Sequence, residues 1–422
     1  MALLCLGLLA ACQSAPQPAI PTATATLAPA VTVTPQTPTP APDAPITLTL
    51  WLPTRFLPGD NNAAYQALQR QLDAFAQSDD GTPSQISVKQ DRGPGGLLDL
   101  LRAAQPVAPS ILPDIIALDN ADLETAARAG LLQPLDALLP ADLIADLFPF
   151  ARELVTFNSE TLGIVYSADL EHLITVSSDE PPDNWLDLLN AKQRYVFAPH
   201  AGSQNASDAV LAHYLSSAGT FVDDLGNPLI KPAVLQTLLE KYQTAQQDGD
   251  LPANFLDLSS PDEAWNAWRA TRNGLGQIQA TRFLSVAAQL PEANAAPVPG
   301  QLRPADPIGR GWAFAIVTRD PRRQAAAAQL LQQLLSPQSN GDWTLAAKVL
   351  PRRQGALAAW DQALPYTGFI RDQLLKAHAA PPSAVLNVIS PALRKAVDDV
   401  LTSRATPAEA AQTAAAEVNG KQ

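Results

Sequence analysis

The chain has 422 residues, of which 46% are hydrophobic, and this is enough to fill the cores of roughly two or three domains. Its 28 Lys and Arg stand against 41 Asp and Glu, and the net charge of −13 repels nucleic acid and anionic lipid headgroups. Cys5 and Cys12 are the only cysteines, which excludes a disulfide framework and a cysteine-based zinc site. The four histidines are scattered, so we expect no metal and no other cofactor.

The N-terminus predicts a lipoprotein signal. Residues 2–11 are apolar, too few to span a bilayer but typical of a signal-peptide core. The letters LAAC at residues 9–12 resemble the bacterial lipobox, in which small residues precede a cysteine that is lipidated and becomes the new N-terminus. We therefore expect a signal peptide over residues 1–11 and acyl chains on Cys12. The alternative is that Cys12 is one small apolar residue of the run.

Residues 12–45 predict a disordered tether. The segment is rich in Pro and Thr, and it has too few bulky side chains to offset the entropy of ordering. A lipid followed by such a tether would hold a folded body close to the outer face of a bacterial cytoplasmic membrane.

The first part of the body alternates strands and helices. A strand pattern at residues 46–51 precedes a helical pattern at 64–75 and a second strand at 86–88. A helix at 97–104, a strand at 113–118, a helix at 122–129 and a strand at 162–166 follow. Repeated units of this kind imply a mainly parallel sheet covered by helices on both faces.

The remainder predicts a second α/β layer and a helical end. Residues 195–198 and 276–279 are expected strands, and residues 208–215, 232–247 and 261–272 are expected helices. Asp183 or Asn184 is a suitable cap for a helix that begins near Trp185. After a strand at 311–317 the chain is largely helical. Two α/β lobes with a helical C-terminal region describe the whole body.

Four stretches in this order resemble the family 1 extracellular solute-binding proteins, the sugar-type receptors of ABC importers. They are residues 113–119 with 129–136, residues 163–169 with 181–189, residues 311–317, and residues 389–401 with 406–412. The resemblance implies the two-lobed type 2 periplasmic-binding-protein-like fold. We expect residues 46–163 and 311–350 to form lobe 1, and residues 164–310 and 351–422 to form lobe 2.

In such proteins two lobes close over the ligand, so contacts come from loops at strand ends and from segments that cross between lobes. Sugars present apolar faces edged by hydroxyls, which suit aromatic rings combined with carboxylate, amide and guanidinium groups. The candidates are Trp51, Arg55 and Phe56 after the first strand, Asp119 and Asn120 after the third, Tyr166 and Asp169 at the first crossing, Ser203 and Asn205 before a helix, Arg282 after a short strand, and Trp312 at the next crossing.

Each candidate has a structural alternative. Trp51 and Trp312 could pack in the core, and Arg282 could pair with a surface carboxylate. Trp265 and Trp268 lie three residues apart and are expected in the core, as is Trp185.

Catalytic motifs are weak in this sequence. RGPGG at residues 92–96 matches neither GxGxxG nor the P-loop, so we interpret it as a turn, and no GxSxG elbow is present. The first hypothesis is thus a monomeric lipid-anchored receptor that captures a small polar solute, a sugar or oligosaccharide, and delivers it to ABC permease subunits. The alternatives are a surface-anchored hydrolase on the same scaffold, which would need converging carboxylates, and a lipoprotein that senses its ligand and signals to a membrane partner.

Overall fold

The computed structural model describes residues 45–56, 63–79, 81–360 and 366–420. Residues 46–422 form one compact unit. The predicted signal peptide, Cys12 and nearly all of the predicted tether lie outside the described residues. Among the described residues, no helix is both long and apolar enough to cross a membrane.

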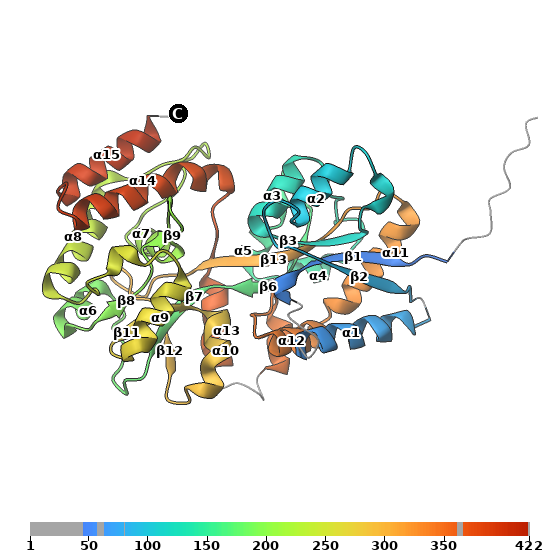
Figure 1. The fold of residues 1–422 in the computed structure, drawn as a ribbon, viewed down its shortest axis with the longest axis horizontal. Helices are drawn as coiled ribbons and strands as arrows, with labels where there is room; N and C mark the ends of the chain where they lie inside the picture. Colours follow the sequence, from blue (N-terminus) through green and yellow to red (C-terminus); the bar gives the residue numbers. More distant parts are fainter. Residues whose placement is uncertain (1–44, 57–62, 80, 361–365, 421–422) are drawn as a thin grey trace, which may run out of the picture. The chain divides into compact units, whose positions relative to one another are not determined.

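The first lobe is built on a sheet with the strand order β14-β13-β3-β1-β2, in which β6 also pairs with β13 (Figure 1). Its strands are β1 (Leu48–Pro53), β2 (Ser84–Lys89), β3 (Ile115–Asp119), β6 (Ile164–Asp169), β13 (Ile308–Ile316) and β14 (His378–Ala379). Its helices are α1 (Ala63–Ala76), α2 (Leu97–Ala104), α3 (Asn120–Arg128), α4 (Ala141–Ala145), α5 (Pro149–Glu153), α11 (Pro321–Leu334) and α12 (Pro337–Ala347). A hairpin and three short turns complete it: β4 (Thr156–Phe157), β5 (Glu160–Thr161), η1 (Thr54–Phe56), η2 (Pro109–Ile111) and η5 (Gln354–Ala359).

The second lobe is built on a sheet with the order β12-β7-β11-β8. Its strands are β7 (Glu171–Thr175), β8 (Tyr195–Val196), β11 (Leu275–Gln279) and β12 (Asn294–Ala296), with a separate hairpin of β9 (His200–Ala201) and β10 (Asn205–Ala206). Its helices and helical turns are α6 (Trp185–Ala191), α7 (Asp208–Ser216), α8 (Pro232–Asp248), η3 (Phe255–Asp257), α9 (Pro261–Thr271), α10 (Ala280–Val286), η4 (Ala287–Gln289), α14 (Ser383–Leu401) and α15 (Pro407–Asn419). In Figure 1, α14 and α15 lie beside α8. Helix α13 (Thr367–Lys376) contacts η5.

Both sheets are mixed, although most pairings in the first sheet, including that of β13 with β14, are parallel as expected. β1 pairs in parallel with β2 and β3, as the βα pattern predicts, but β13 runs antiparallel to β3 and β6. The physical reason is connectivity: β13 enters from the second lobe and therefore crosses the first sheet in the opposite direction. In the second lobe, β7 is antiparallel to both β11 and β12.

The described structure also bears on the expected lobe boundaries. β6, expected to open lobe 2 at residue 164, pairs with β13 in the first sheet, so the chain leaves that sheet only after Asp169. The 3-10 turn η5, also expected in lobe 2, packs against α12 of the first lobe. Both segments therefore extend the first lobe in this structure.

Local sequence explains most element ends. The Asn184 side chain accepts a hydrogen bond from the Asp187 amide and caps α6, and Gly130, with a φ of 65°, follows α3. Gly309 is required by a close approach, because a Cβ there would lie 2.3 Å from the Phe150 ring. β13 can therefore pass α5 at the point where the chain crosses between lobes.

Candidate functional site

Three strand ends meet where the chain crosses between the two sheets. β6 ends at Asp169 and β7 begins at Glu171, so a single residue separates the last strand of one sheet from the first strand of the other. β13 begins nearby, with Arg310 paired in register with Asp169. These crossings bring first-lobe and second-lobe side chains together.

Arg310 connects β13 to a second-lobe helix. Its Nε and Nη2 donate to the two carboxylate oxygens of Asp208, the first residue of α7, at 2.5 and 2.7 Å. A bidentate pair of this kind fixes both groups in orientation. The Asp208, Glu171 and Asp119 carboxylates outweigh the desolvation of Arg310 and raise its pKa above the usual range.

Glu171 is a carboxyl group in an acidic setting. Burial, and then the charges of Asp208 and Asp169, raise its pKa to about 8, although a hydrogen bond from Gln277 Nε2 at 2.8 Å and the charge of Arg310 oppose the shift. A protonated Glu171 at neutral pH has a donor as well as an acceptor. The Asp169 Oδ1 accepts from the Thr281 amide at 3.2 Å.

Asp119 joins this group from the end of β3. It is buried, it caps α3 by accepting from the Ala121 and Asp122 amides at 2.9 Å, and Arg92 Nε donates to it at 2.6 Å. Arg92 belongs to the RGPGG segment, which forms the expected turn and carries a guanidinium into the site. We call Arg92, Asp119, Asp169, Glu171, Asp208 and Arg310 the crossing cluster.

Aromatic rings pack behind the crossing cluster in the first lobe. The Phe56 ring centroid lies 5.4 Å from Trp312, 6.1 Å from Tyr166 and 5.3 Å from Trp343. Trp312 is half-buried, whereas Phe56, Tyr166 and Trp343 are buried. Trp312 also pairs in register with Asp119, so a partly accessible ring lies next to a carboxylate of the crossing cluster.

A chain of polar side chains runs from Glu171 into the second-lobe core. Gln277 bonds to Glu171 on one side and accepts from the Tyr195 hydroxyl on the other. Tyr195 contacts His213 Nε2 at 3.2 Å, and His213 Nδ1 lies 2.7 Å from the Tyr242 hydroxyl. Burial lowers the pKa of His213 to about 3, so this histidine is neutral at physiological pH. We call these five residues the polar relay.

The other predicted residues lie elsewhere. Trp51 is buried in β1, with Lys89 Nζ 5.2 Å from its ring centroid, and Arg55 belongs to η1, where its side chain is not described. Arg282 pairs with Asp262 of α9, the alternative given for it above. Asn205 is exposed in β10.

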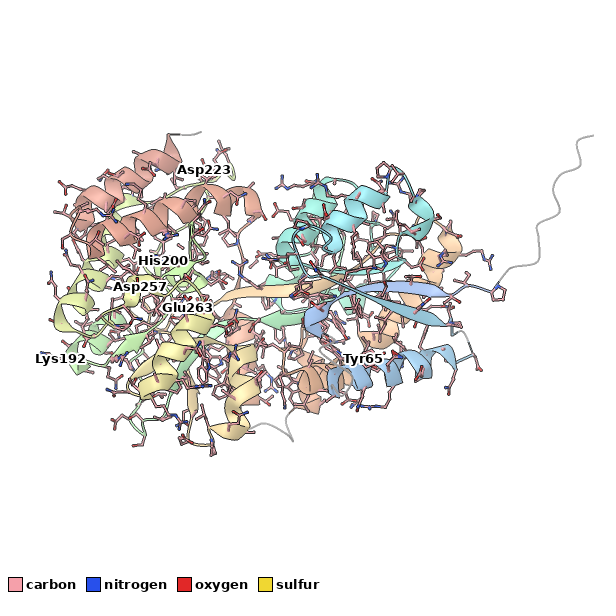
Figure 2. The ribbon with its side chains drawn as sticks, viewed as in Figure 1. Tyr65, Lys192, His200, Asp223, Asp257 and Glu263 are labelled. Carbon is pink, nitrogen blue, oxygen red and sulfur yellow. The ribbon has the colours of Figure 1, made fainter. Side chains whose placement is uncertain are left out.

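Ser203 lies at a separate pocket of about 360 Å³ in the second lobe, with Arg394, Lys395 and Arg404. Close to it, His200, labelled in Figure 2, bonds through Nε2 to the Asp398 Oδ1 of α14 at 2.7 Å.

Asn120 lines another pocket, of about 350 Å³, on the first lobe. Glu124 and Arg128 of α3, Glu153 of α5, Phe157 of β4 and the residues that precede α14 are among its other lining residues.

Sequence analysis missed four residues of the crossing cluster: Arg92, Glu171, Asp208 and Arg310. Arg310 comes directly before the predicted strand at 311–317, and Glu171 comes two residues after Asp169. Their position as ionisable residues at the ends of buried strands could therefore have identified Arg310 and Glu171 as candidates. Trp185, Trp265 and Trp268 are buried, as expected. Within the described ranges, no group of three or more His, Cys, Asp or Glu could hold a metal ion.

The chain thus forms two lobes joined by crossing strands, with polar and aromatic groups at the junction. The family model for bacterial extracellular solute-binding proteins matches residues 62–341, more than half of the chain, and the chain belongs to this family. Members of this family are described as solute-binding proteins. No curated protein matches the chain by sequence.

Solved structures show the same two-lobed fold. The cyclic α-maltosyl-1,6-maltose binding protein of Arthrobacter globiformis superposes with a TM-score of 0.73 at 18% identity, covering 89% of this chain and 99% of that one. The maltose-bound MalE3 of T. maritima gives 0.68 at 18% identity, covering 89% and 100%. The sugar-binding protein MalE of Xanthomonas citri gives 0.68 at 16% identity, covering 89% and 97%.

Proposed function

We propose that this protein is the receptor of an ABC importer and captures an oligosaccharide between its two lobes. Proteins with this fold are described as binding maltose, cyclic maltosyl-maltose and maltodextrins. Among sugars, α-glucans are therefore the first ligands to test. The work of such a receptor comes from contacts that exist only when ligand touches both lobes, because these contacts favour closure.

The crossing cluster beside Trp312 is the observation that carries the proposal. It places carboxylates from both lobes and two first-lobe guanidiniums next to a partly accessible indole ring. Carboxylates accept from sugar hydroxyls, guanidiniums donate to them, and the indole face covers the apolar face of a pyranose. Trp312, Asp119, Asp169, Glu171 and Arg310 are the residues that we propose for this site.

The remaining candidates stay in the proposal as second contributors. They are Trp51, Arg55, Phe56, Asn120, Tyr166, Ser203 and Asn205, whereas Arg282, which pairs with Asp262, is left out of the proposed site. Tyr166 and Phe56 are buried here and would support the ring of Trp312 from behind.

We further propose that the body is held at the extracellular face of the membrane by a lipid on Cys12 and acts as a monomer with permease subunits. The family assignment and the sequence around Cys12 support this arrangement. Mass spectrometry of the N-terminal peptide, for the mass of acyl chains on Cys12, tests the anchor separately from ligand binding.

Tryptophan fluorescence of the full-length protein tests the ligand class. We would titrate it with maltose, maltotetraose, unrelated oligosaccharides and short peptides. The expected result is a saturable change with an α-glucan that is lost or strongly weakened in Trp312→Ala. A buried second-lobe indole supplies the matched control, because Trp265→Phe should keep the saturation curve. A folded protein that responds to peptides and to no sugar would overturn the proposal.

A further inference from the structure

A carboxylate of the first lobe caps a helix of the second lobe. Glu124 lies on α3, is only 6% exposed, and accepts a hydrogen bond from the backbone amide of Ser383 at 2.7 Å. Ser383 is the first residue of α14, which packs against α8 and α15 in the second lobe. The bond therefore joins the two lobes through residues that are not part of the crossing cluster.

The two oxygens of this carboxylate have different partners. Oε1 accepts from Arg128 Nε and Nη2, at 3.1 and 2.8 Å, one turn further along α3. Oε2 is left for the Ser383 amide. Arg128 thus orients the carboxylate towards its partner in the other lobe.

Helix α14 depends on this outside group. The first amides of a helix have no partner within the helix, and a negative charge is favourable at this end. The residue before α14 is Pro382, and no side chain of the α14 cap supplies a hydrogen bond. Glu124 therefore fills the place of a local N-cap for a helix of 19 residues.

The position of this bond suits the control of lobe movement. Helix α3 starts next to Asp119 of the crossing cluster, and α14 starts directly after the segment that leads out of β14. The pocket of about 350 Å³ that contains Asn120 is lined by Glu124, Pro381 and Pro382, so there is open space beside the bond into which that segment can shift.

We propose that Glu124 and Ser383 form an interlobe latch that sets the balance between lobe arrangements, and through it the ligand affinity, without contacting ligand. The ligand part of this inference rests on the proposed function. The latch stabilises the arrangement in which it is formed, so its loss shifts the population towards other arrangements. The ligand affinity rises if that shift populates the arrangement that binds ligand, and it falls if the shift depopulates that arrangement.

Two variants remove the latch from opposite sides. Glu124→Ala deletes the acceptor. Ser383→Pro deletes the donor at a first helical position, where proline is well tolerated. Glu124→Gln keeps a neutral acceptor and should restore part of the effect. Glu153→Ala is the matched control, because this exposed glutamate lines the same pocket.

The first readout needs no ligand. Small-angle scattering of the sugar-free full-length chain should show the same change in Glu124→Ala and Ser383→Pro, and the double variant should change no further. Hydrogen exchange should rise in the peptide that covers the start of α14. Scattering curves of both single variants that match the wild type would overturn the latch.

The second readout is affinity. For the sugar that binds the wild type, both variants should change the Kd by about fivefold in the same direction, whereas Glu153→Ala should stay within about twofold. Opposite directions in the two variants would overturn the latch. If the wild type binds no sugar but the two variants still show the scattering change, the proposed function is contradicted and the latch is supported.

Discussion

In the first lobe, aromatic rings fill the core next to the crossing cluster. In the second lobe, the hydrogen-bonded side chains of the polar relay lie next to it. Trp343 and Tyr166 meet at 4.1 Å between ring centroids, and the Tyr166 hydroxyl finds no partner among the described residues. The Tyr195 hydroxyl, in contrast, bonds to both Gln277 and His213. The first lobe thus supports an apolar surface and the second fixes the orientation of polar groups, a division that suits a ligand with an apolar face and polar edges.

The largest expected effect concerns the aromatic side. Trp343→Ala removes a fully buried ring and should lower the free energy of unfolding by about 3–5 kcal/mol in urea titrations. Trp312→Ala removes a half-buried ring and should lower it by only about 1–2 kcal/mol. Equal losses in the two variants would contradict the view that Trp343 supports the core and Trp312 borders the site.

The second-largest expected effect is a pH dependence of folding stability that comes from Glu171 of the polar relay. Since the folded-state pKa of Glu171 is raised from 4.5 to about 8, the folded chain retains a proton that the unfolded chain releases. This group therefore reduces stability as the pH rises from about 4.5 to 8. Glu171→Gln removes that dependence. The stability of the variant minus that of the wild type should increase by about 1–3 kcal/mol between pH 5 and pH 8.

Comparing the variant with the wild type at each pH isolates Glu171. Burial lowers the pKa of His172 to about 4 and of His213 to about 3, so these groups make the protein more stable as the pH rises from their folded-state values towards 6.5. Their contribution is common to both proteins and cancels in the difference. A difference that stays constant from pH 5 to pH 8 would show that Glu171 is ionised in the folded state.

A matched pair of hydroxyl deletions gives the smallest effect. Tyr242→Phe removes a bond to His213 Nδ1 and should cost about 1 kcal/mol. Tyr166→Phe removes a buried hydroxyl without a described partner and should be neutral or slightly stabilising. Thermal unfolding of the two variants in parallel measures the contrast. A larger loss of stability in Tyr166→Phe than in Tyr242→Phe would contradict the view that hydroxyl hydrogen bonds matter in the second lobe and not in the first.

Periodicity predicted most elements because their burial is set locally. The strand pattern at 46–51 became β1, the helical spacing at 232–247 became α8, and Asn184, one of the two residues expected to cap α6, does so. The direction of β13 and the place of β6 were not predictable in this way, because they depend on which distant strand each one meets.

The site was predicted only in part, for the same reason. Asp119, Asp169 and Trp312 were named from their positions at strand ends and crossings. Arg310 and Asp208 lie 102 residues apart, and no local pattern indicates that they pair. Arg282 has the residue type and the position expected of a ligand contact, but a neighbouring helix supplies its partner, Asp262.

Calorimetric titration of Arg310→Gln and Arg282→Gln with maltotetraose tests the central claim most directly. Both variants neutralise one arginine, but only Arg310 belongs to the crossing cluster. We expect Arg310→Gln to weaken binding by at least about tenfold and Arg282→Gln by less than about twofold, with both variants folded by thermal unfolding. Undiminished binding in Arg310→Gln together with a loss in Arg282→Gln would contradict a ligand site at the crossing between the lobes.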